Sequence, residues 1–282
     1  MRLLVCTLAF LFVTAPAEAQ LRDLIKKGER LLGRKEVKQG LEMAQAMTRD
    51  FTEEEEVEIG RIISASILAT YPLSSDDALQ RYVTLVGNTV AMYSERPNLE
   101  WHFAVLETSM VNAYSAPGGY IFITTGALAQ IRSEAELAAV LGHEIAHATE
   151  KHILDEIKRA EIWSTGGQIA DERLGSLGLT DERARKVGEI GRGRLFENGI
   201  GRREELEADR IGVTVAAAAG YHPAGLMLVL ESLSRLSGGE DSIIEQLTST
   251  HPRPEDRIQA ITRYSNGDGV LLADRWERWT LR

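Results

Sequence analysis

The stretch HEIAHATEKH, residues 143–152, decides which kind of fold and site this chain can form. Two histidines four residues apart share one face of a helix, because four residues cover about 400° of rotation. His143 and His147 can therefore bind one metal ion from the same side through neutral imidazole nitrogens. Glu144 lies about 100° further round the helix, where its carboxylate can reach a water molecule at that ion. An ordinary helix with a polar outer face is the alternative.

The residues around this stretch weigh against the ordinary helix. Segment 133–163 has the pattern of one long helix, and Ser133 and Glu136 have the spacing of a capping box. Two imidazoles in so apolar a helix need polar partners. The metzincin extension is absent, because Glu150 and Ile153 stand where that motif has glycine and histidine. A third metal ligand must therefore come from elsewhere in the chain.

A second acidic helix is predicted at EELEADRIG, residues 204–212. Glu205 and Asp209 are four apart and share a face. Glu205 as a ligand, with Asp209 accepting a hydrogen bond from a ligand imidazole, would complete a metal site. Glu204 and Glu207 lie on other faces of that helix and are predicted to be solvated. Taken alone, the cluster is more typical of a surface helix with ion pairs to Arg202, Arg203 and Arg210.

The rest of the chain predicts a mainly helical α+β fold. Helical periodicity marks residues 57–71, 74–95, 203–221 and 223–236. Strand patterns mark 99–107 and 111–128, the second with a Pro-Gly-Gly turn at its centre. A few short strands among many helices indicate an α+β domain with a small antiparallel sheet. Residues 164–203 are rich in glycine and form a connector, which we hypothesise to be a gating loop.

Charge and the amino-terminal segment limit the classes of function. The 282 residues carry a net charge of −10, which excludes a nucleic-acid partner. Arg2, the apolar run 3–13 and an Ala-x-Ala ending predict a secretory signal peptide over 1–19. An uncleaved anchor is the alternative, and no other stretch is long and apolar enough to span a membrane. The only cysteine, Cys6, lies in this segment, so the mature chain would have neither a disulfide nor a thiol nucleophile.

Four motifs together give a resemblance to a known family. In chain order they are VNAYSAPGGYIFITTG (111–126), HEIAHATEKH (143–152), ELEADRIG (205–212) and STHPRPEDRI (249–258). The chain resembles the gluzincin zinc metallopeptidases, the family of HtpX, the CAAX prenyl endopeptidases and the periplasmic proteases BepA and LoiP. The resemblance covers residues 55–265. It implies a zincin-type fold, one Zn²⁺ per chain and a zinc metallopeptidase domain over 51–282. Residues 20–50 have the pattern of one or two polar helices and are predicted to form an N-terminal helical extension.

The same resemblance assigns a role to each residue that matches a motif. It implies zinc ligands at His143, His147 and Glu205, with Glu144 as the catalytic base. Asp209 supports a ligand histidine, and Arg257 matches the arginine of the last motif. His251 stabilises the oxyanion or caps the metal in a resting state, and Asn112, at the start of a substrate-binding strand, helps to hold the substrate carbonyl. The remaining histidines, His102, His152 and His222, are predicted to be structural residues outside the site.

The resemblance also implies the partners and the compartment. The expected substrates are polypeptides, above all misfolded envelope proteins, cleaved by a soluble periplasmic enzyme; partner proteins stay unassigned. Two features depart from the family. HtpX and the prenyl endopeptidases have several membrane spans, which this sequence lacks, and only a short tail follows STHPRPEDRI where BepA carries a helical repeat domain. The alternative function is a zinc-containing chaperone or binding module with latent or negligible peptidase activity.

Overall fold

The computed structural model describes residues 50–165, 199–236 and 251–280, together with 26, 30, 33, 34, 187–191, 193, 195 and 196. The predicted signal peptide lies outside these residues, as do nearly all of the predicted extension 20–50 and residues 166–186 of the glycine-rich connector. The site described below lies within one compact unit, formed by Thr52–Ile157 and Leu179–Arg282. No helix in the described ranges is long and apolar enough to cross a membrane.

Helices make up most of this unit, and their first turns follow from local sequence. α3 (Glu53–Thr70) begins with a capping box between Thr52 and Glu55, and four glutamates occupy its first turn, where the helix dipole favours negative charge. α4 (Asp77–Ala91) begins at Asp76, whose carboxylate accepts two backbone N–H groups. The further helices are α5 (Thr125–Leu128), α6 (Glu134–Thr149), α7 (His152–Thr165), α9 (Arg202–Ala218), α10 (Gly225–Leu236), α12 (Pro254–Ile261) and α13 (Ala273–Thr280).

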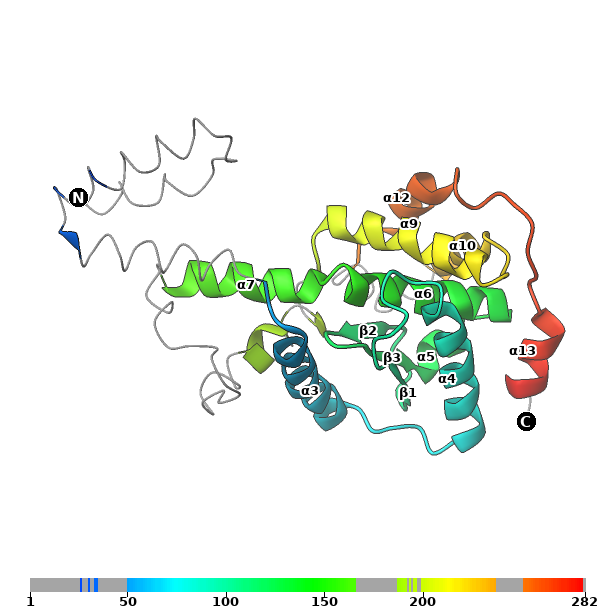
Figure 1. Ribbon diagram of the computed structural model, residues 1–282. Helices are drawn as coiled ribbons and strands as arrows, with labels where there is room; N and C mark the ends of the chain where they lie inside the picture. The colour runs from blue at the N-terminus through cyan, green and yellow to red at the C-terminus, as the bar shows by residue number, and fades with distance from the viewer. Residues whose placement is uncertain are drawn as a thin grey trace. The chain divides into compact units, whose positions relative to one another are not determined.

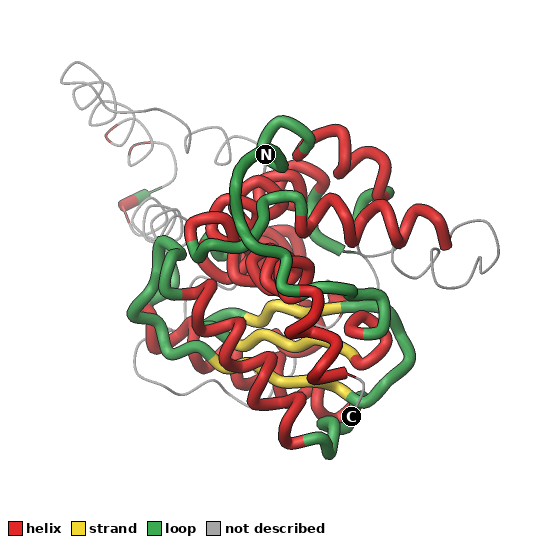
Figure 2. The backbone as a smooth tube through the Cα atoms, turned by 90° about the vertical axis from the view of Figure 1, so that its right-hand side faces the viewer, coloured by secondary structure: helices red, strands yellow, loops and turns green. Residues whose placement is uncertain are grey.

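The described residues form one three-stranded sheet in the order β1-β3-β2 (Figure 2). β2 (Ala113–Ala116) and β3 (Tyr120–Thr124) make an antiparallel hairpin, whose turn contains Gly118 and Gly119 with positive φ angles of 75° and 89°. β1 (His102–Leu106) pairs with β3 in the parallel direction. The α+β class is therefore confirmed, but the sheet is mixed where an antiparallel one was expected. The connection after β1 crosses to the far edge, so the returning strand β3 fills the centre and runs parallel to β1.

α6 is the central helix of the unit. It packs against α9, α10 and α4 and against the strands β2 and β3, and Figure 1 shows it between the sheet on one side and the pair α9 and α10 on the other. Glycines bring α6 and α9 into backbone contact: a Cβ on Gly212 would lie 2.6 Å from the His143 nitrogen, and one on Gly142 would lie 2.8 Å from the Gly212 oxygen. This close crossing places the acidic face of α9 directly over the histidines of α6.

The long helix expected over 133–163 is interrupted. α6 ends at Thr149, Lys151 adopts a left-handed conformation with φ of 58°, and α7 starts afresh at His152. A left-handed residue directly after a helix is a common way for the helix to end. At the start of α6 the Ser133 hydroxyl caps the Glu136 N–H as predicted, although the Glu136 carboxylate accepts from the Arg132 N–H and not from that of Ser133.

Candidate active site

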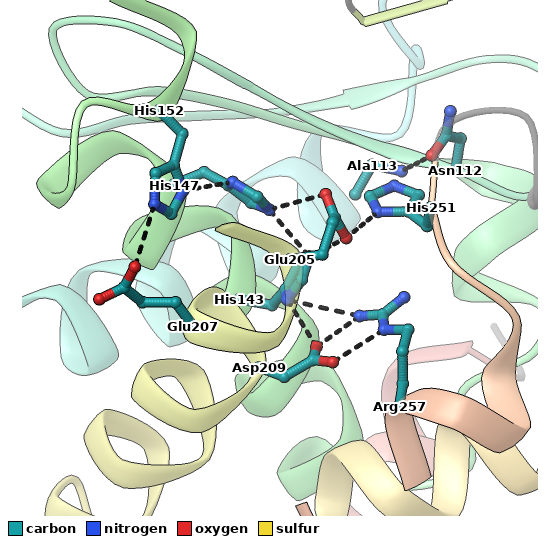
Figure 3. Close-up of polar contacts among 10 residues, drawn as sticks. All are labelled: Asn112, Ala113, His143, His147, His152, Glu205, Glu207, Asp209, His251 and Arg257. Atoms are coloured by element: carbon teal, nitrogen blue, oxygen red, sulfur yellow. Dashed lines mark hydrogen bonds and ion pairs between the residues drawn. The ribbon is translucent and has the colours of Figure 1, made fainter. Parts of the chain in front are cut away.

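Three side chains from two helices converge on one point (Figure 3). His143 and His147 come from α6 and Glu205 from α9, and each offers one ligand atom within 4.8 Å of the others. The two histidine Nε2 atoms are 3.1 Å apart; Glu205 Oε1 is 3.4 Å from His147 Nε2, and Oε2 is 3.7 Å from His143 Nε2. Tetrahedral zinc with bonds of about 2.1 Å separates its ligand atoms by about 3.4 Å. The cluster therefore has the dimensions of a zinc site.

The Glu205 carboxylate gives an independent test of whether these residues fit a metal. Its side chain is fully buried, and no described residue gives its Oε1 a hydrogen bond. His147 Nε2 lies at ion-pair distance from that oxygen but does not meet the geometry of a hydrogen bond. A buried carboxylate oxygen without a donor costs free energy, and a cation among the three ligand atoms would satisfy it. The donor set, two imidazoles and one carboxylate, is one that zinc prefers.

The charges around the site keep both carboxylates ionised. Burial raises the pKa of Glu205, but the neighbouring His251 and His147 outweigh it and hold that pKa well below its usual range. Burial likewise raises the pKa of Asp209, and the Arg257 guanidinium and His143 lower it below its ordinary value. An ionised carboxylate is the form that binds a metal or orients a ligand imidazole.

His143 is held from behind by a charged pair. Its Nδ1 lies 2.9 Å from Asp209 Oδ1. Arg257, from α12, donates two hydrogen bonds to the same carboxylate, from Nε to Oδ2 at 2.9 Å and from Nη2 to Oδ1 at 2.6 Å. Burial and the Arg257 charge lower the pKa of His143, so its imidazole is neutral. The structure thus brings Asp209 and Arg257 to the place that the sequence predicted, behind a ligand histidine.

His147 has a different partner, which the sequence reading missed. Its Nδ1 lies 2.9 Å from Nδ1 of His152, whose Nε2 lies 3.9 Å from Glu207 Oε2. Burial lowers the pKa of His152 to about 4, with His147 adding to the effect. The sequence placed His152 on another face of one continuous helix, and it was not expected to bind the metal. It is not among the clustered ligand atoms, but the break at Lys151 turns it toward His147. Glu207, expected to be solvated, has a side chain that is 38% exposed. No glycine marks the break before Lys151, so the sequence carried no ordinary signal for it.

The other predicted residues surround the ligands. Glu144 is buried and lines a cavity with His147, Glu205 and His251. His251 Nδ1 lies 2.7 Å from Glu205 Oε2. Asn112 stands directly before β2, and its Oδ1 accepts the Ala113 N–H at 2.9 Å.

Two histidines stay outside the site, as predicted. His102 stacks on Tyr120, with ring centroids 4.6 Å apart. His222 accepts the Ala224 N–H through its Nδ1.

Comparisons with known proteins agree with this geometry. The model described as Peptidase family M48 matches residues 77–265. The mitochondrial metalloendopeptidase OMA1 of Arabidopsis thaliana is 30% identical over 185 residues, 66% of this chain and 36% of that protein. The beta-barrel assembly-enhancing protease of Escherichia coli K12 is 25% identical over 210 residues (72% and 42%), and the metalloprotease LoiP of the same strain is 26% identical over 171 residues (60% and 64%). The chain thus spans less than half the length of the first two relatives.

Proposed function

Because this chain belongs to peptidase family M48, we propose that it is a zinc metalloendopeptidase that hydrolyses peptide bonds in unfolded polypeptides. One observation carries the proposal: His143, His147 and Glu205 converge with the dimensions of a zinc site, and Glu144 stands beside them. Two of the relatives are described as a metalloendopeptidase and a metalloprotease. The proposed catalytic domain is 51–282, within which the family match lies.

The residues of the site divide the chemistry among them. Zinc, when bound, lowers the pKa of a water molecule and polarises the scissile carbonyl. Glu144 accepts the proton of the attacking water and passes it to the leaving amine. Asp209 orients His143 as a ligand, while burial and the charge of Arg257 lower its pKa and keep the imidazole neutral. His251, the imidazole that contacts Glu205 from the loop before α12, is placed to stabilise the developing oxyanion.

The substrate would bind along β2. The Thr124 N–H donates to the Asn112 carbonyl, so Asn112 directs its backbone groups toward β3. In an antiparallel pair this direction alternates along the strand. The backbone groups of Ala113 and Ser115 therefore face the outer edge of the sheet. A substrate in extended conformation can add to this edge as a further strand. Both residues line the cavity that contains Glu144. The Asn112 amide, at the start of the strand, is placed to donate to a substrate carbonyl.

A second cavity beside Glu144 suggests which side chains the enzyme accepts. Its volume is about 70 Å³, and α10 supplies much of its wall, through Leu226, Val229, Leu230 and Leu233. An apolar wall next to the reacting centre favours an apolar residue of the substrate beside the scissile bond. Stretches with exposed apolar residues are typical of unfolded proteins, which supports these as the substrate class.

The proposed compartment is the periplasm, and the proposed substrates are misfolded envelope proteins. The signal-peptide pattern over 1–19 and the relatives described as beta-barrel assembly-enhancing proteases support this proposal. Other relatives are described as mitochondrial metalloendopeptidases, so membership of the family does not by itself assign a compartment.

A second candidate function is a latent zinc protein that binds unfolded chains without cutting them. The contact between His251 and Glu205 favours it, because an imidazole at that position can hold the site closed. Normal zinc content, no cleavage and suppressed aggregation of unfolded proteins would support this candidate. Cleavage that appears in His251→Ala alone would assign the latency to His251.

The test is cleavage of casein by the purified chain, with a chelated sample and two variants beside it. Glu144→Gln is expected to keep one zinc ion per chain and to cleave about 10²–10⁴-fold more slowly. Glu54→Gln, an exposed glutamate of α3, is the matched control and should cleave like the unmodified protein. A Glu144→Gln protein that cleaves at the normal rate would disprove the assignment of the base, and a chain that binds no zinc would disprove the proposed function.

A further inference from the structure

We propose that His152 is a positioning residue, which holds His147 in the one tautomer that can bind zinc through Nε2. The inference rests on the proposed function, since it concerns the zinc ligands of that site. His152 is the last residue of HEIAHATEKH (143–152), but from the sequence it was predicted to have no role in the site.

The two ligand histidines differ in what stands behind them. Both turn Nε2 toward the site, where the two atoms are 3.1 Å apart. Behind His143 is the Asp209 carboxylate, 2.9 Å from Nδ1. Behind His147 is another imidazole, also at 2.9 Å, and its ring is tilted by 72° to that of His147 (Figure 3). A ligand imidazole nearly always donates its second ring N–H to an acceptor, and for His147 that acceptor is His152.

The position of each proton follows from this contact. An imidazole that binds a metal through Nε2 must carry its proton on Nδ1. Two facing Nδ1 atoms at hydrogen-bond distance can share only one proton, so His147 donates and His152 accepts. The proton of His152 then lies on its Nε2, which faces the Glu207 carboxylate 3.9 Å away. That negative charge favours the same tautomer of His152, so Glu207 supports the arrangement electrostatically.

The backbone is built to hold His152 in this place. The left-handed Lys151 turns the chain between α6 and α7, and the His152 side chain is buried. Lys151 Nζ is 3.2 Å from Oε2 of the fully buried Glu56, whose Oε1 accepts the Gly118 N–H at 3.1 Å. The turn that presents His152 is thereby tied to the turn between β2 and β3.

The alternative is that His152 only fills space in the core. That role would explain its burial but not the contact between its Nδ1 and Nδ1 of His147. Asparagine keeps an acceptor oxygen, Oδ1, at the position of the His152 Nδ1, whereas leucine keeps the volume and removes the acceptor. The two variants therefore separate hydrogen bonding from packing. His222→Leu is the matched control, since His222 bonds a backbone N–H away from the site.

The experiment measures zinc affinity of the full chain by competition with a chromogenic chelator. His152→Leu is expected to bind zinc about 10–100-fold more weakly, the usual effect of removing the partner of a ligand histidine. His152→Asn should recover most of that loss, and His222→Leu should bind like the unmodified chain. Unchanged affinity in His152→Leu, or an equal loss in His152→Leu and His152→Asn, would overturn the inference.

A spectroscopic measurement on the unmodified chain decides the matter even if His152→Leu does not fold. Long-range ¹H–¹⁵N correlation spectra of the zinc-loaded protein should show the proton of His147 on Nδ1 and that of His152 on Nε2. A proton on Nδ1 of His152 would overturn the inference. A chain that binds zinc but cuts no peptide would overturn only the peptidase proposal, whereas a chain that binds no zinc would overturn both.

Discussion

Replacing Arg257 by methionine tests whether the charged pair behind His143 holds the site together. Methionine keeps much of the apolar volume and removes the guanidinium. The fully buried Asp209 carboxylate now has three contacts within 3 Å, one to His143 Nδ1 and two to Arg257. In the variant only the contact with His143 would remain. We expect the variant to unfold more easily, because it leaves a buried charge without its main partner.

The size of the effect follows from the burial of the pair. Removing one partner of a buried ion pair costs about 3–5 kcal/mol. Against a typical total stability of about 5–15 kcal/mol, this is a large fraction. For a chain of this size it corresponds to a decrease in Tm of about 6–20 °C.

The assay is urea and thermal unfolding in the presence of a chelator, so that zinc binding does not contribute. The matched control is Arg202→Met, because Arg202 and Asp256 form a second pair between the same two helices, α9 and α12, at 3.4 Å. Those side chains are 65% and 42% exposed, so the control should lose at most about 1 kcal/mol. An Arg257→Met protein within 1 kcal/mol of the control would refute the view that this pair is a buried, mutually dependent unit.

Three further predictions address other parts of the site. Gly212→Ala places a methyl group 2.6 Å from the His143 nitrogen, so the chain should lose about 1–3 kcal/mol in urea unfolding and bind zinc more weakly in titrations. Val229→Phe should narrow the apolar cavity and shift cleavage toward smaller side chains at the scissile bond, as read by mass spectrometry of the products. The depressed pKa of Asp209 contributes stability that is present above about pH 4 and lost as the pH falls toward the folded-state value, so Asp209→Asn should flatten the stability profile only below that pH.

How much of the site could be predicted from the sequence depends on how local each relation is. His143 and His147 were predictable because a helix alone places residues four apart on one face. The same rule paired Glu205 with Asp209, but it could not bring that pair to the histidines; the resemblance supplied this, and the structure agrees. His152 was misplaced because its position depends on one left-handed residue, Lys151, in a segment without glycine.

The same distinction explains the errors in the fold. A hairpin with a Pro-Gly-Gly turn is a local feature, and β2 and β3 were predicted correctly. The pairing of β1 with β3 joins residues that are 18 apart in sequence, such as His102 and Tyr120, and depends on which edge the connection reaches.

The closeness of α6 and α9 links metal binding to folding. Each helix contributes a pair four residues apart, and the site exists only where the two pairs meet, since Glu205 contacts both histidines and Asp209 contacts one. Gly142 and Gly212 permit that meeting, because a Cβ at either position would lie within 3 Å of a backbone atom of the facing helix. A metal that binds only the assembled interface stabilises it by RT ln(1 + [L]/Kd), which is about 4 kcal/mol at a concentration of 1,000 Kd. Zinc should therefore protect the α6–α9 interface most, and a substitution at the crossing should weaken folding and metal binding together.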